Sequence, residues 1–336
     1  MSGAGSFRYP LVLSASAAAL VALMLLSVAK GSVPLTLGQV LGALDLIQTP
    51  VSPLVRRIVT DIRLPRTLLA VITGAGLAMV GGLLQTATRN DLADPFLFGL
   101  SSGASAGAVL TITRFGDGLG PATLPVAAFA GGISAAAAVM LLFHFARRRG
   151  AEQLIICGLA VSFLFGALTS YLIFAGDQRA AGAVLFWTLG GLGAAEWDNL
   201  PLAALSLLLC GGFTLWRWRW LDGLLAGEAA AQSLGINLSR LRIEVFLCCA
   251  ISTSLLVSLT GVIGFVGLMV PHVCRHLAGV RHLRVLPLCA LTGAILLCGG
   301  DILSRTLLAP QELPVGIITA GIGGLFMLGM LFRAPS

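Results

Sequence analysis

Apolar runs of helical length follow one another along almost the whole chain, separated by short polar stretches. They cover residues 11–29, 64–87, 97–113, 124–145, 152–175, 199–216, 243–260, 263–277, 285–307 and 314–332. About 20 consecutive apolar residues carry an α-helix across the hydrocarbon core of a bilayer. The apolar residues are continuous rather than alternating, which favours helices over the strands of a membrane barrel. We therefore predict an all-α polytopic membrane protein with about ten transmembrane helices, in which residues 1–336 form one domain.

The overall composition also indicates that lipid is the solvent of this chain. Hydrophobic residues make up 57% of the sequence and charged residues only 10%, against about 25% charged residues in an ordinary soluble domain. So few ionic groups cannot cover a large water-facing surface, which excludes an ordinary cytosolic enzyme. The first run follows Arg8 and has the length of a secretion signal, but the many later runs predict a retained first helix.

The basic residues lie between the apolar runs, and their distribution predicts the orientation. Twenty arginines and Lys30 contribute to a net charge of +7. Because these residues flank the runs, we attribute them to the positive-inside rule rather than to nucleic-acid binding. An even number of spans places both termini on one side, and an inside N-terminus leaves 13 of the 21 basic residues at inner ends. Both termini are therefore predicted to be cytoplasmic.

Residue patterns for ATP or metal chemistry are missing from the sequence. A phosphate-binding loop needs the pattern GxxxxGK[ST], and the only lysine, Lys30, lacks the upstream glycines. Any ATP hydrolysis must therefore come from another polypeptide. His272, Cys274 and His276 come nearest to a metal site, but their position at an inner helix end favours interfacial polar residues, and no metal site is predicted. The seven cysteines fall mostly inside apolar runs and are expected to be thiols rather than disulfides.

Local spacing predicts an ion pair, a helix in an inner segment and close helix packing. Asp301 and Arg305 are four residues apart, so on a helix they face one another across one turn. The inner segment over residues 216–242 is long enough to be structured, and we predict a helix over 221–234 that ends at Gly235. Glycines in two runs predict close helix packing by the small-residue rule. They are Gly74, Gly76, Gly81, Gly82, Gly316, Gly321, Gly323 and Gly324.

Four stretches together resemble a known family. The first begins at residues 63–67 and continues through Gly74, Gly81 and Gln85 to residues 90–95 and 99–104. The second covers residues 227–235 and ends at Arg242, the third covers 264–272 with Arg275, His276 and 282–287, and the fourth joins Asp301 and Arg305 to 312–316. Their order and spacing resemble the FecCD-type permease subunits of bacterial ABC importers for iron chelates, heme and cobalamin. The chain departs from that pattern at Asp91, where the family often has proline, and at Gly324, where Gly-x-Pro is frequent.

The resemblance implies a type II ABC importer permease and a set of partners. Two copies of the chain would form a central pathway in the bacterial inner membrane, above two cytoplasmic ABC ATPase subunits and below a periplasmic substrate-binding protein. The chain would have no enzyme activity and no permanently bound cofactor, because ATP and Mg would be used by the ATPase subunits. The implied cargo is an iron chelate, either heme or a ferric siderophore, and cobalamin is the alternative. Two other classes remain open, an ion-coupled secondary carrier and a membrane receptor or scaffold without transport.

The resemblance also implies roles for particular residues. Three arginines at the outer ends of spans, Arg63, Arg66 and Arg305, would accept acidic groups of the binding protein. The competing explanation is membrane anchoring for Arg63 and Arg66, and an ion pair with Asp301 for Arg305. The inner segment, about residues 217–242, would couple the permease to the ATPase, with a passive connector as the alternative. Its centre and rim would comprise Leu225, Gly227, Glu228, Ala231, Ser233, Leu234, Gly235, Arg240 and Arg242. A separate hypothesis, which does not come from the resemblance, places four residues after the fifth span near the pathway: Arg179, Trp187, Gly190 and Gly191. For Arg179, a solvated loop charge is the alternative.

Overall fold

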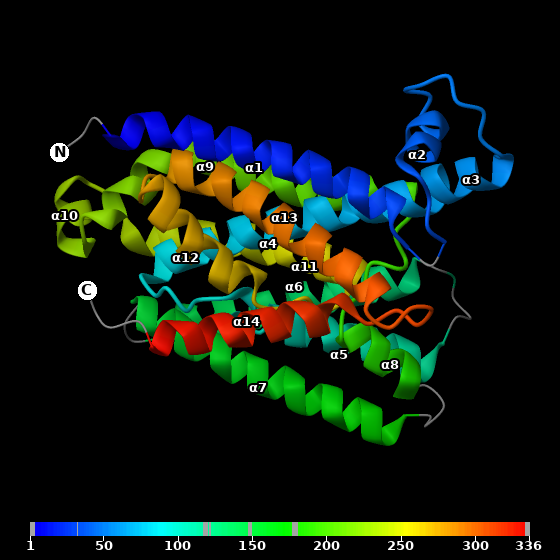
Figure 1. Ribbon diagram of the computed structural model, residues 1–336. Coiled ribbons are helices and arrows are strands. Elements are labelled where there is room, and N and C mark those ends of the chain that lie inside the picture. Colours follow the sequence, from blue (N-terminus) through cyan, green and yellow to red (C-terminus); the bar gives the residue numbers. More distant parts are fainter. Residues whose placement is uncertain are drawn as a thin grey trace.

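The computed structural model describes residues 4–31, 33–116, 120, 122–146, 150–176 and 181–332, and the regular elements in these ranges are helical. Ten long helices in the described ranges form the bundle (Figure 1). They are α1 (Ala4–Ala29), α4 (Leu64–Thr88), α5 (Leu100–Arg114), α6 (Thr123–Phe145), α7 (Ala151–Ala175), α9 (Leu200–Leu225), α11 (Leu238–Thr260), α12 (Val266–Ala278), α13 (His282–Thr306) and α14 (Val315–Leu331). Shorter elements connect them, namely α2 (Leu37–Ala43), α3 (Pro53–Arg57), η1 (Ile58–Arg63), η2 (Pro95–Phe98), α8 (Ala181–Thr188), η4 (Trp197–Asn199) and α10 (Glu228–Ser233). The predicted all-α fold is confirmed.

Each of the ten apolar runs coincides with one of the long helices. Seven helical stretches in the described ranges are long and apolar enough to cross a membrane, whereas α5, α12 and α14 have 15, 13 and 17 residues. The shortest, α12, begins only at Val266. Gly261 and Phe265 before it adopt φ angles of 66° and 68°, which a right-handed helix does not contain. The eighth predicted span, from residue 263, therefore starts three residues too early.

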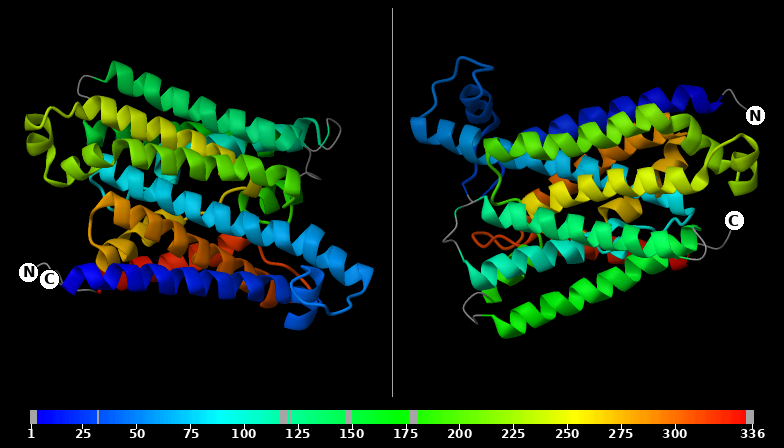
Figure 2. Two further views of the ribbon diagram at one scale, coloured as in Figure 1. Left: turned by 90° about the horizontal axis from the view of Figure 1, so that it is seen from above. Right: turned by 180° about the vertical axis from the view of Figure 1, so that it is seen from behind.

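The long helices run side by side, so the bundle has two distinct ends (Figures 1 and 2). One end carries α10, together with the start of α1 and the end of α14, and the opposite end carries α2, α3 and α8. We call these the α10 end and the α2 end. Because the first and last described helices both reach the α10 end, the bundle is crossed an even number of times, as predicted.

The central helix of the bundle is α4. It contacts α9, α11, α12 and α13. In the helical stretch that includes α4, 83% of an apolar 18-residue segment is buried, against 17% of such a segment in α1 and 22% in α7. Glycine makes this burial possible. A Cβ on Gly74 would overlap the carbonyl oxygen of Gly293 in α13, and a Cβ on Gly81 would overlap that of Gly267 in α12. The predicted packing role of Gly74 and Gly81 is thus confirmed.

The segment between α9 and α11 differs from its prediction. α9 continues to Leu225, well beyond the predicted end of the sixth span at residue 216. The helix predicted over 221–234 is wrong as a single element, because Gly227 adopts a φ of 104° and separates α9 from α10. Gly235, with a φ of 79°, follows the end of α10 as predicted. The side chain of Asn237 then caps α11 by accepting a hydrogen bond from the amide of Arg240.

Candidate translocation and coupling sites

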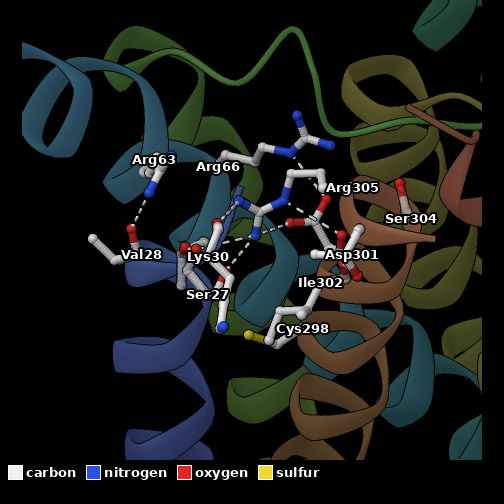
Figure 3. Close-up of polar contacts among 12 residues, drawn as sticks. Ser27, Val28, Lys30, Arg63, Arg66, Cys298, Asp301, Ile302, Ser304 and Arg305 are labelled. Atoms are coloured by element: carbon white, nitrogen blue, oxygen red, sulfur yellow. Dashed lines mark hydrogen bonds and ion pairs between the residues drawn. The ribbon is translucent and has the colours of Figure 1, made fainter. Parts of the chain in front are cut away.

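A buried cluster of charged residues joins α4 and α13 at the α2 end (Figure 3). Asp301 in α13 is fully buried, and its Oδ1 accepts a 2.9 Å hydrogen bond from Nε of Arg66 in α4. Nη2 of Arg305 lies 2.9 Å from Oδ2 of the same carboxylate. Arg66 also donates a 2.7 Å hydrogen bond from Nη1 to Glu312. The predicted Asp301–Arg305 ion pair is confirmed, and the shared carboxylate offsets the cost of burying two guanidinium groups.

Further hydrogen bonds attach this cluster to the end of α1. Nη1 of Arg63 donates to the carbonyl oxygen of Val28 over 2.8 Å, and Nη1 of Arg305 donates to that of Lys30 over 2.8 Å (Figure 3). Carbonyl groups at the end of a helix have no partner within the helix, so these two arginines cap α1. Both side chains are buried. Of the three arginines predicted to accept a binding protein, Arg63 and Arg305 are therefore engaged in internal contacts, and Arg66 is the partly exposed one.

A cavity of about 740 Å³ opens at the α2 end beside the charged cluster. Its wall is formed by residues of α4, α6, α8, α9, α11, α13 and α14 and of the loops between them. Trp187, Gly190 and Gly191, which were predicted to lie near a pathway, all line it, and so does Arg66. Arg179 lies outside the described residues. The structure thus brings one predicted docking residue and three predicted pathway residues to the same cavity.

Close backbone contacts fix the wall of this cavity. Gly190 has a φ of 71°, and a Cβ at this position would overlap the carbonyl oxygen of Val262. A Cβ on Gly316, at the start of α14, would overlap the carbonyl oxygen of Leu189. The amide of Gly191 donates a 2.8 Å hydrogen bond to the carbonyl oxygen of the last residue of α11. Glycine is needed at 190 and 316 because three chain segments meet there at backbone distance.

Acidic side chains at the rim of the cavity were missed by sequence reasoning. Glu196, Asp198 and Glu312 line the cavity, whereas Arg66 is the only basic residue among its described lining residues. Arg66 is already paired with Glu312 and Asp301. The described lining therefore carries an excess of negative charge. The available signal was the position of these acids in short polar stretches between apolar runs, but nothing in the sequence places those stretches together.

The coupling residues predicted at the α10 end divide into exposed and buried groups. Leu234 is 70% exposed, and the other exposed members are Leu225, Ser233, Gly235 and Arg240. Ala231 is instead fully buried in the main apolar core, which anchors α10 to the bundle. A shallow groove of about 350 Å³ runs beside the exposed group and is lined by residues 232 and 235–239. An apolar side chain exposed on a segment beyond the bundle is a typical contact for another protein.

The position predicted for Arg242, at the rim of the coupling segment, is wrong. Arg242 is buried, its Nη2 donates a 2.7 Å hydrogen bond to Glu228, and its Nε donates over 3.2 Å to the carbonyl oxygen of Ala87 in α4. A guanidinium group enters a protein interior only with such partners. Arg240 is exposed, as predicted for the rim, and pairs with Glu244 at 2.8 Å.

A buried threonine and histidine and a partly exposed aspartate near the α10 end were also missed. Oδ1 of Asp222 in α9 accepts hydrogen bonds from the backbone amide (2.9 Å) and Nδ1 (2.6 Å) of His282, the first residue of α13. Nε2 of His282 lies 2.8 Å from Oγ1 of Thr86 in α4. The order resembles a hydrolytic triad, but the hydroxyl of Thr86 is buried and also lies 2.9 Å from the carbonyl oxygen of Gly82. It is not presented to a substrate, so these residues connect helices rather than perform nucleophilic chemistry.

The three residues that came nearest to a metal site do not converge. The rings of His272 and His276 have their centroids 4.8 Å apart. Sγ of Cys274 lies instead 3.5 Å from Oγ1 of Thr292 in α13. Within the described ranges, no three His, Cys, Asp or Glu residues gather as potential metal ligands.

Known proteins resemble this chain along most of its length. The FecCD transport family matches residues 19–333. The hemin transport system permease protein of Yersinia pestis is 37% identical over 282 residues, which cover 81% of this chain and 82% of that protein. The Fe(3+) dicitrate transport system permease protein of Escherichia coli is 38% identical over 276 residues, covering 82% and 85%, respectively. The vitamin B12 import system permease protein of Vibrio cholerae is 36% identical over 290 residues, covering 84% and 85%. A solved structure described as an inward-facing, metal-chelate type ABC transporter is 30% identical and superposes with a TM-score of 0.85 over 97% of this chain and 100% of that chain.

Proposed function

The chain belongs to the FecCD transport family and is a multi-pass membrane permease of the ABC importer type. We propose that it moves an iron chelate, heme or a ferric siderophore, from the periplasm to the cytoplasm. The observation that carries the proposal is the separation of two sites at the two ends of one bundle. The cavity lies at the α2 end, and α10, around which the exposed residues lie, is at the other end of the bundle (Figure 1). An ATP-driven importer needs this separation, because cargo enters at one face while the ATPase acts at the other.

The lining of the cavity supports a bulky and weakly held cargo. Phe186, Trp187, Gly190 and Gly191 offer aromatic and backbone surface, which contacts a large ligand without binding its metal. Weak contact suits conduction, because the cargo has to be released again. The relatives named for hemin and ferric dicitrate favour an iron chelate, and the relative named for vitamin B12 makes cobalamin the second candidate.

We propose that the α2 end faces the periplasm and the α10 end the cytoplasm, with both termini cytoplasmic in the inner membrane. The positive-inside rule supports this orientation, since 13 of the 21 basic residues belong to the predicted inner ends. Three of the others, Arg63, Arg66 and Arg305, are engaged in internal contacts. The chain would act as one domain over residues 1–336, with a second copy of itself completing the pathway.

A separate ATPase is proposed to dock on the coupling segment, about residues 217–242. The sequence lacks a phosphate-binding loop, so ATP and Mg would be bound by that partner. Leu234→Asp should abolish both co-purification with the ATPase and transport, because a charge replaces an apolar contact. Leu46→Asp is the matched control, since Leu46 is 65% exposed and precedes α3 at the α2 end. Normal transport and retained co-purification in the Leu234 variant would exclude the coupling role.

A periplasmic binding protein is proposed to dock at the α2 end. Arg66 is the proposed direct contact, because its side chain is partly exposed at the cavity. Arg63 and Arg305 would contribute by holding the same surface in place. Arg66→Glu should weaken association with the binding protein most strongly at low salt, where charges are least screened, and Arg66→Lys should retain most of the affinity. Unchanged affinity of the Arg66→Glu variant at low salt would exclude this contact.

An ion-coupled carrier is the alternative of a different class, and the environment of Asp301 argues against it. Such a carrier needs an intramembrane acid that binds and releases the driving ion. The Asp301 carboxylate is held by two guanidinium groups, at 2.9 Å each. A carboxylate in two buried ion pairs is not free to exchange a cation.

The experiment that tests the proposed function is uptake into proteoliposomes that contain the permease and its ATPase. Binding protein is supplied with heme, ferric siderophores or cobalamin, and a catalytically inactive ATPase variant serves as the control. The proposal expects accumulation of heme or a ferric siderophore with the active ATPase only. Accumulation of cobalamin alone would reassign the cargo. Failure of the assembled complex with the whole panel would contradict the proposal.

A further inference from the structure

Three consecutive residues in the last turn of α4 bond to three different helices. Gln85, Thr86 and Ala87 are joined to α12, α13 and α11, respectively. Successive residues of an α-helix point about 100° apart, so one turn can face three neighbours. The loop that follows this turn is attached as well, because Nη1 of Arg275 in α12 donates to both Gln85 (2.7 Å) and Asp91 (2.9 Å). The end of α4 is thus a junction between four parts of the chain.

The first connection from the coupling segment to this junction is ionic. Glu228, the first residue of α10, accepts the 2.7 Å hydrogen bond from Nη2 of Arg242. Nε of the same guanidinium reaches the carbonyl oxygen of Ala87 over 3.2 Å. This carbonyl lies at the end of α4, where the helix dipole favours a positive charge. One buried arginine therefore connects α10 to α4.

The second connection starts on the other flank of the coupling segment. Asp222 lies in the last turn of α9, just before Gly227 separates α9 from α10. A carboxylate only accepts hydrogen bonds, so Nδ1 of His282 donates to it over 2.6 Å, and Nε2 of the same ring meets Thr86 at 2.8 Å. His282 and Thr86 are both buried. The coupling segment is thereby attached to one turn of α4 at two points, Asp222 at the end of α9 and Glu228 at the start of α10.

We infer that these two bridges transmit the movement of the coupling segment to the end of α4, and that Arg242, His282 and Thr86 are positioning residues for the coupling of ATP hydrolysis to transport. The inference rests on the proposed function. The central side chains of the two bridges, Arg242 and His282, are buried. A displacement of the coupling segment therefore cannot leave the last turn of α4 in place without breaking a hydrogen bond of one of them. The same turn is bonded to α12 and to the loop at Asp91, so the displacement reaches the core of the bundle.

A matched pair of threonines tests this inference. Thr86 and Thr88 are both buried in the last turn of α4, and each hydroxyl oxygen also lies close to the carbonyl oxygen four residues earlier, at 2.9 and 2.7 Å. Of the two side chains, Thr86 is the one that meets His282. Valine has nearly the same shape as threonine, so Thr86→Val removes the bridge with little change in packing. Thr88→Val is the control, and Thr86→Ser should rescue because it restores the hydroxyl.

The measurement is the number of ATP molecules hydrolysed per cargo molecule imported in proteoliposomes, together with stimulation of the ATPase by loaded binding protein. Thr86→Val should retain assembly and basal ATP hydrolysis but raise the ratio by about fivefold or more, the lower range of coupling between linked sites. Thr88→Val and Thr86→Ser should keep the wild-type ratio. A purely structural role predicts that assembly, hydrolysis and transport fall together.

An unchanged ratio in Thr86→Val, with active wild-type complex alongside, would overturn the inference while leaving the proposed function intact. A wild-type complex that does not transport at all would instead contradict the proposed function. If Thr86→Val does not assemble, Arg242→Lys decides, because one ammonium group cannot span Glu228 and the Ala87 carbonyl as two guanidinium nitrogens do. A wild-type ratio in that variant would likewise overturn the inference.

Discussion

Replacing Asp94 by asparagine should stabilise the protein at neutral pH. Asp94 lies between α4 and η2 and is buried, and its Oδ1 accepts a 2.9 Å hydrogen bond from the amide of Phe96. Loss of hydration raises the pKa of this carboxyl group to about 6, although the hydrogen bond from Phe96 acts in the opposite direction. Asparagine keeps an oxygen acceptor at the same place and removes the charge.

The raised pKa of Asp94 sets the size and the sign of the effect. The usual pKa is 3.8, and each pH unit of difference is worth about 1.4 kcal/mol, so the ionised carboxylate costs about 3 kcal/mol. Below about pH 4 the group is protonated in the folded and the unfolded chain, and the cost vanishes. Between about pH 4 and 6 the folded chain binds more protons, so its stability falls as the pH rises, and above this range the cost is constant.

The assay is thermal unfolding in detergent, followed by tryptophan fluorescence between pH 4 and 8. The stability of Asp94→Asn relative to wild type should be close to zero at pH 4 and should grow to about 3 kcal/mol above pH 6. A variant that is less stable than wild type at pH 7, or a difference independent of pH, would refute the reasoning.

Three further substitutions test the packing, the charged cluster and the cavity wall. Gly293→Ala would place its methyl group 2.6 Å from Cβ of Ala78 and against the carbonyl oxygen of Gly74, so α4 and α13 must separate by about 1 Å. The free energy of unfolding should fall by about 1–3 kcal/mol. Gly299→Ala in the same helix meets no described atom within 4 Å and should leave the stability unchanged. Asp301→Asn leaves the buried Arg305 and the partly exposed Arg66 without their shared charge and should cost about 3–5 kcal/mol in the same assay, whereas wild-type stability would show that the cluster does not hold the α2 end. Gly190→Ala would push the wall of the cavity away from Val262 and should reduce uptake in proteoliposomes while assembly with the ATPase is retained. Gly193→Ala, which has open space around it among the described residues, should transport normally. Equal uptake by both variants would contradict the role of the wall.

The positions of the helices were predictable because they depend on local composition. A continuous apolar run favours a helix in lipid, because a helix satisfies its own backbone hydrogen bonds, and each of the ten runs has one. The breaks between helices were harder, because Gly227, Gly261 and Phe265 look like ordinary helix or run residues until their φ angles are known. The same limit applies to the glycines of α14. A Cβ on Gly323 would meet Phe265, but no described atom lies within 4 Å of such an atom on Gly321 or Gly324, so the packing predicted for these two does not occur among the described residues.

The candidate sites were predictable only in part, because burial depends on contacts between distant segments. The Asp301–Arg305 pair follows from a spacing of four residues on a helix. The capping of α1 by Arg63 does not, because its partner Val28 lies 35 residues away. Arg242 also becomes a buried link only through Ala87, which lies 155 residues away. Long-range partners of this kind leave no local pattern in a single sequence.

The energy source of uptake tests the central claim most directly. Proteoliposomes contain the permease and its ATPase and receive loaded binding protein. One sample has internal ATP and no ion gradient, and the other has proton and sodium gradients but no ATP. The measurement is the amount of labelled iron chelate inside the vesicles. We expect accumulation with ATP and only background with the gradients. Accumulation driven by a gradient without ATP would contradict the account and assign the chain to the ion-coupled carriers.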